Sequence, residues 1–111
     1  MMNITKNEIN AIIARAFTTA KIEANNKMSE RVITLVKAEN AEAQKMDRND
    51  FFEQAIESVE KVRNDLSMLS CRKLLAEDLE KAKRLAQLAR FYEYVAFELN
   101  IGKRDRSLIT R

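Results

Sequence analysis

The scarcity of helix-breaking residues is the feature that most constrains what this chain can fold into. Its 111 residues include no proline and one glycine, Gly102. Proline ends or kinks a helix and glycine weakens one, so almost the whole chain is free to be helical. Apolar residues recur at every third or fourth position, and strand-like alternation is absent. The sequence therefore predicts an all-α protein, a small bundle of three or four helices, mostly antiparallel, with a long C-terminal helix.

Two helices are expected in the first 46 residues. The segment Thr5-Lys6-Asn7-Glu8 has the form of a capping box and predicts a helix start. The apolar stripe that begins at Ile9 and the stripe that begins at Met28 differ in direction by about a quarter turn on one ideal helix. This difference favours a break near Asn25–Ser29, with Ser29 as the cap. One long bent helix over residues 6–46 remains an alternative, because no proline or glycine forces the break.

The next helix is expected to begin after a polar turn at residues 46–50, with Asp50 as its cap. Its apolar face runs from Phe52 to Leu69. Beyond it, three leucines would lie nearly opposite that face if the helix continued: Leu74, Leu75 and Leu79. Since a helix cannot bury opposite faces against one core, a turn is predicted within residues 67–70.

The last helix is expected to run from about Cys71 to Asn100 and to be the most buried, because small and bulky apolar residues cover about half of its circumference. A narrow strip of mostly small residues would permit close approach of a neighbouring helix: Leu75, Leu79, Ala82, Ala86, Ala89 and Ala96. The heptad Leu75, Ala82, Ala89 and Ala96 could equally be completed by a second copy of the chain. Gly102 is expected to end the helix in a left-handed conformation. The predicted domain is thus 1–102, followed by a basic tail, 103–111.

The composition excludes much enzymatic chemistry. Without histidine, no Ser-His-Asp triad and no imidazole metal ligand can form, and one cysteine, Cys71, supplies neither a disulfide nor a cysteine zinc site. Three acidic pairs lie at helical spacing: Glu39/Glu42, Glu57/Glu60 and Glu77/Glu80. Lysines and arginines lie nearby, Lys81 four residues after Glu77 and Arg84 four after Glu80, so these carboxylates are interpreted as members of surface ion pairs. We therefore expect a non-enzymatic protein without metal or cofactor. No apolar run approaches the length of a membrane span, and a reducing cytoplasm is the expected location.

The expected role is to bind a larger protein and so to regulate, inhibit or adapt it. On the last helix, two aromatics project away from the leucine and alanine face, on the side that carries arginines, and aromatics beside arginines are frequent at binding hot spots. Burial of these rings by a neighbouring helix is the equally weighted alternative. The predicted partner-binding residues are Arg84, Gln87, Arg90, Phe91, Tyr94 and Glu98.

Charge suggests a second role. Residues 1–71 hold 10 basic and 11 acidic residues, whereas residues 72–111 hold 10 basic and 6 acidic ones. An excess of positive charge favours contact with nucleic acid, an acidic protein surface or anionic lipid, although a solvated helix end explains it slightly better. The residues expected to make such a contact are Lys103, Arg104, Arg106 and Arg111. A nucleic-acid-associated protein is therefore the first alternative, and a self-assembling scaffold or homo-oligomer is the second.

Overall fold

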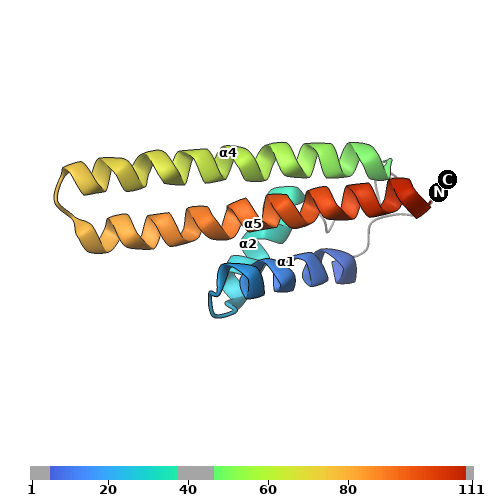
Figure 1. Ribbon diagram of the computed structural model, residues 1–111, viewed down its shortest axis with the longest axis horizontal. Helices are drawn as coiled ribbons and strands as arrows, with labels where there is room; N and C mark the ends of the chain where they lie inside the picture. Colours follow the sequence, from blue (N-terminus) through green and yellow to red (C-terminus); the bar gives the residue numbers. More distant parts are fainter. Residues whose placement is uncertain (1–5, 38–46, 110–111) are drawn as a thin grey trace.

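The fold is all-α, as the sequence predicts. The computed structural model describes residues 6–37 and 47–109, and within them it contains helices and no strand. The helices are α1 (Lys6–Ala20), α2 (Asn26–Val36), α4 (Arg48–Leu75) and α5 (Leu79–Ile109). The two long helices, α4 and α5, form an antiparallel hairpin, and α1 and α2 pack against one half of it (Figure 1).

The packed half is a four-helix arrangement around one core. Helix α5 contacts α4 and α1, while α2 contacts α1 and α4, so the four helices close a ring. Each helix contributes an apolar face. The largest fully buried side chains are Ile9, Ile12, Ile13, Val32, Phe52, Val59, Phe91, Val95 and Leu99. The other half of the hairpin extends beyond α1 and α2, and no other described helix packs against it, which gives the molecule an elongated shape of 51 × 24 × 22 Å (Figure 1).

The break between the first two helices is confirmed, and the single helix over 6–46 is not formed. Helix α1 ends with Lys21 in the left-handed conformation, at φ 58°. The amide of Ile22 then donates to the carbonyl of Phe17 at 3.1 Å. This pattern is a helix-ending turn that is usually built on glycine. Ile22 is partly buried against the core, so the chain entering α2 is fixed in place.

The cap of α2 is Asn25, so the expectation of Ser29 was wrong. The Asn25 side chain accepts hydrogen bonds from the amides of Lys27 and Met28, at 2.9 and 3.3 Å. Asparagine is as good a cap as serine. Ser29 lies one turn later, where its hydroxyl donates to the Asn25 carbonyl at 3.2 Å.

Two other helix caps were expected, at Asp50 and at Thr5. Asp50 is not the cap of α4: it lies in the first turn of that helix, after the N-cap residue Asp47. An acidic residue there still stabilises the helix, because its charge opposes the positive end of the helix dipole. Thr5, the expected cap of α1, lies outside the described residues.

The turn predicted within residues 67–70 was also wrong. Helix α4 continues without interruption to Leu75, and the connection to α5 is Ala76–Asp78. The prediction assumed that Leu74, Leu75 and Leu79 must be buried, but all three are exposed. The apolar stripe changes direction because it leaves the four-helix core, not because the helix ends.

Gly102 does not end α5, contrary to the sequence prediction. The helix continues to Ile109, past the boundary placed at residue 102, and Gly102 has no positive φ. Its role is steric: a Cβ atom at this position would lie 3.3 Å from Cε1 and Cζ of Phe52, which is fully buried. The glycine therefore lets the Phe52 ring approach the backbone of α5.

Gly102→Leu should lower the free energy of unfolding by about 1–3 kcal/mol, because a large side chain would push Phe52 out of its place. Leucine is a better helix former than glycine by somewhat under 1 kcal/mol, so any loss of stability must come from this crowding. Urea unfolding followed by circular dichroism measures the change. Higher stability of the variant would contradict the assigned role of Gly102.

Candidate protein-binding site

The end of the hairpin carries a concentration of exposed apolar side chains. Of the six large apolar side chains that the described residues leave exposed, five lie within residues 68–79, which we call the tip. They are 42–86% exposed, and Leu75 is the most exposed. The five residues are Met68, Leu69, Leu74, Leu75 and Leu79. Single exposed apolar residues are ordinary, but five of them within one short segment make the tip a candidate binding surface.

The turn at the tip is held by backbone hydrogen bonds. Glu77 adopts the left-handed conformation at φ 62°, and its amide donates to the carbonyl of Leu74 at 3.0 Å. The amide of Asp78 donates to the carbonyl of Lys73 at 2.9 Å. The Asp78 carboxylate then accepts from the amide of Lys81, at 3.4 Å, at the start of α5. Helix α4 therefore ends and α5 is capped within the connection Ala76–Asp78.

Small residues bring the two helices together behind the tip. Ala82, Ala89 and Ala96 are buried, whereas Leu75, Leu79 and Ala86 are exposed, so the strip of small residues predicted for the last helix is buried only in part. The hydroxyl of Ser70 donates to the carbonyl of Ala82 at 2.7 Å, across the hairpin. This bond and the close packing fix the tip before any partner binds, which lowers the entropy lost on binding.

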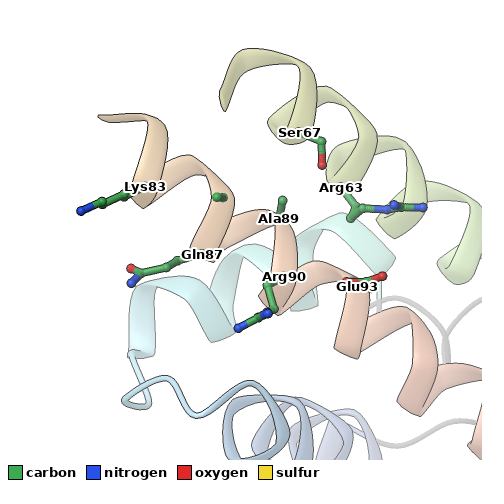
Figure 2. Close-up of a pocket in the computed structure, with 8 residues that line it drawn as sticks. Arg63, Ser67, Lys83, Gln87, Ala89, Arg90 and Glu93 are labelled. Carbon is green, nitrogen blue, oxygen red and sulfur yellow. The ribbon is translucent and has the colours of Figure 1, made fainter. Parts of the chain in front are cut away.

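A groove lies beside the tip, between α4 and α5. Its volume is about 510 Å³, and its lining is rich in basic and small residues. Figure 2 shows Arg63 and Ser67 projecting from α4, and Lys83, Gln87, Arg90 and Glu93 from α5. The lining of the groove is therefore positively charged, and one of its arginines, Arg63, has a buried Nε atom without a hydrogen-bond partner among the described residues.

Phe91 does not lie on an exposed face, contrary to the sequence prediction. Its side chain is 0% exposed, and its ring stacks on that of Phe17 with centroids 4.5 Å apart. The ring of its neighbour Tyr92 meets it edge-on. Burial raises the pKa of the Tyr92 hydroxyl above its usual value, and the Arg31 charge opposes this effect, so Tyr92 is a neutral phenol. The alternative considered from the sequence, that a neighbouring helix covers Phe91, is the one that is formed.

Two other predicted binding residues also belong to the folded core or its edge. Tyr94 is partly buried and packs against the core. Glu98 is only 7% exposed, and its carboxylate accepts a bond from Nε of Arg15 at 2.9 Å, which joins α5 to α1. The sequence did contain a signal for this face. Phe91, Val95 and Leu99 recur at four-residue spacing and form a second apolar stripe on α5.

The remaining predicted binding residues are exposed on α5 and fall into two groups. Gln87 and Arg90 line the groove, whereas Arg84 is exposed but does not line it. The structure therefore brings together two of the six predicted residues. The groove also includes Arg63, Ser67 and Lys83. Sequence reasoning missed Arg63 and Ser67 because they lie on another helix, α4, and it missed Lys83 because no aromatic residue is next to it.

The basic C-terminal residues are partly engaged within the fold. Residues 103–109 continue α5 rather than forming a separate tail. The Lys103 ammonium donates to the Glu53 carboxylate at 2.9 Å, and Arg104 is exposed. The side chain of Arg106, and Arg111 as a whole, lie outside the described residues.

Other sequence features take simple positions. Cys71 is exposed on α4, within the tip. Glu77 lies in the turn rather than in a helix, so it and Lys81 are not an i,i+4 pair of one helix, and Glu39 and Glu42 lie outside the described residues.

Among the residues that the structure describes, no group of three or more acidic or cysteine side chains could hold a metal ion. No helix in the described ranges is both long and apolar enough to cross a membrane.

Comparison with known proteins adds no relative: no protein family, curated protein or solved structure matches the chain. The site must therefore be interpreted from its own geometry.

Proposed function

We propose that this protein is a non-enzymatic binding protein whose hairpin tip docks into an apolar cleft of a larger protein. The observation that carries the proposal is the gathering of five exposed apolar side chains at the tip, where no other part of the described chain covers them. Burial of one leucine-sized side chain contributes about 1.5–3 kcal/mol. Several such residues on a rigid support are sufficient for specific binding after the entropy loss is subtracted.

The shape of the molecule supports the same function. The core of α1, α2 and one half of the hairpin holds the fold, and the other half projects beyond it (Figure 1). Apolar residues kept outside a well-packed core are available to a partner. Binding at the tip would regulate, inhibit or connect that partner by occupying its surface.

The single cysteine gives a direct test of this proposal. Cys71 is exposed within the tip, so a photoreactive maleimide attached there will cross-link whatever covers the tip in a lysate of the host cells. We expect one main protein to be captured. A control protein, Cys71→Ser with Asn10→Cys, carries the same label on the exposed side of α1 and should not capture it.

A tip variant then tests whether the apolar residues cause the binding. Leu74→Ser, Leu75→Ser and Leu79→Ser combined should keep the helical spectrum, because all three residues are exposed, and should abolish capture. Undiminished capture by this variant would refute the proposal. Capture of nothing but a second copy of the chain would replace it with self-assembly.

A further inference from the structure

The side of the hairpin that carries the groove forms one continuous surface from the tip toward the other end of α5. Six α5 residues at helical spacing share it, and all are exposed: Leu79, Lys83, Ala86, Arg90, Glu93 and Phe97. Residues spaced by three or four positions lie on one side of a helix. Arg63, Ser67 and Leu74 continue this surface onto α4 at the same kind of spacing. We call the surface the outer face.

The floor of the outer face is shaped for a third helix. Between its two ends, the groove is lined by the small residues Ser67, Ala86 and Ala89. Small side chains let another helix approach closely along a groove between two helices. No part of the described chain fills this position, since α1 and α2 pack on a different side of the hairpin (Figure 2).

The charge of the groove selects an acidic partner. Arg63, Lys83 and Arg90 line it together with one acidic residue, Glu93. Figure 2 shows the charged groups of Lys83 and Arg90 pointing away from α4 and that of Arg63 pointing in another direction, so they do not converge on one point, as a single phosphate would require. The guanidinium of Arg63 adds positive charge to this lining, although its Nε atom is itself buried. A second copy is disfavoured, because pairing two outer faces would oppose like charges.

Apolar residues stand at both ends of the basic stretch. Leu79 and Phe97 are 56% and 54% exposed, and they are separated by five turns of α5, or about 27 Å. Phe97 is the one large exposed apolar residue of the described chain that lies outside the tip. A partner helix with apolar residues at its ends and carboxylates between them would match this order.

From these observations we infer that the outer face binds an acidic amphipathic helix of a partner protein, about five turns long. The inference rests on the proposed function, since it names the chemistry of the partner, and it extends the contact from the tip along the hairpin. The helix would lie in the groove with its carboxylates against Lys83 and Arg90 and its apolar ends against Leu79 and Phe97.

A peptide titration tests the inference. The probe is a fluorescein-labelled helical peptide of about five turns, with leucines near both ends and glutamates on the same face between them. A matched peptide has glutamine in place of each glutamate. Measured by fluorescence anisotropy, the acidic peptide should bind at least about tenfold more tightly, and added salt should reduce the difference. Equal binding of the two peptides, or no binding of either, would overturn the inference.

Two variants locate the binding site. Lys83→Glu with Arg90→Glu should weaken binding of the acidic peptide by at least about tenfold. The control, Lys61→Glu with Lys81→Glu, makes the same change in net charge on exposed residues that do not line the groove, and should leave binding within about twofold. Phe97→Ser should also weaken binding. Equal effects of the two charge reversals would overturn the assignment of the outer face.

Two further experiments distinguish this inference from nucleic-acid binding and from the proposed function of the tip. If labelled duplex DNA binds the outer face more tightly than the peptide, with loss in the Lys83→Glu and Arg90→Glu variant, the occupant is nucleic acid and the inference is wrong. If that variant still captures its partner through Cys71 while peptide binding fails, the tip function stands and the outer-face inference alone is lost.

Discussion

Replacing Phe91 with alanine should lower the free energy of unfolding by about 3–5 kcal/mol, the range observed when a large buried aromatic side chain is removed. Phe91 is fully buried, stacks on Phe17 and lies where α5 meets α1. Its removal leaves a cavity that the neighbouring helices cannot fill without moving. Urea unfolding followed by circular dichroism measures the loss.

Phe97→Ala is the matched control, because it removes the same ring from the same helix at a position that is 54% exposed. This variant should change the free energy of unfolding by less than about 1 kcal/mol. Similar losses in the two variants would show that the burial of Phe91 in α5 is incorrectly assigned. If Phe91→Ala left the free energy of unfolding unchanged, Phe91 would be a surface residue, as the binding hypothesis from the sequence supposed.

Val32→Asp should destabilise the protein by at least about 3 kcal/mol, because it places an unpaired carboxylate in the core. Val32 is fully buried on α2, the shortest of the described helices, which completes the ring of four. The carboxylate must either remain unpaired or force α2 away from the hairpin. Hydrogen exchange of the α2 amides distinguishes these two results, since detachment would speed exchange in α2 before the hairpin opens.

The control for this variant is Thr34→Asp, which places the same side chain on the exposed side of α2. Its effect should stay within about 0.5 kcal/mol. If both aspartates were tolerated equally, α2 would not be packed against α1 and α4 in solution.

Sequence periodicity was sufficient to predict the fold class, the break after α1 and the burial of three alanines on α5. Each of these depends on a pattern within one helix. The heptad of alanines, for example, marks a close helix contact whichever helix supplies it. The positions at which helices end were harder to predict, because Lys21, Lys37 and Glu77 occupy left-handed positions where glycine is usual. The one glycine serves the Phe52 contact instead.

The candidate site was predicted only in part, because it depends on where the core ends. Sequence reasoning assigned every apolar stripe to the core and left Phe91 and Tyr94 equally weighted between the surface and burial by a neighbouring helix. In the structure, Phe91 is buried under α1, and the leucines of the tip are exposed. Among the described residues, this distribution follows from where α1 and α2 pack along the hairpin, which is a property of the assembled bundle.

The arrangement of the helix ends has a practical consequence. Helix α1 begins and α5 ends at the end of the molecule remote from the tip (Figure 1). An affinity handle or a solid support attached ahead of α1 or behind α5 would therefore orient the immobilised protein with its leucines pointing away from the support. Sensor surfaces prepared in this way would present every molecule in the same pose, whereas coupling through Cys71 would hide the tip.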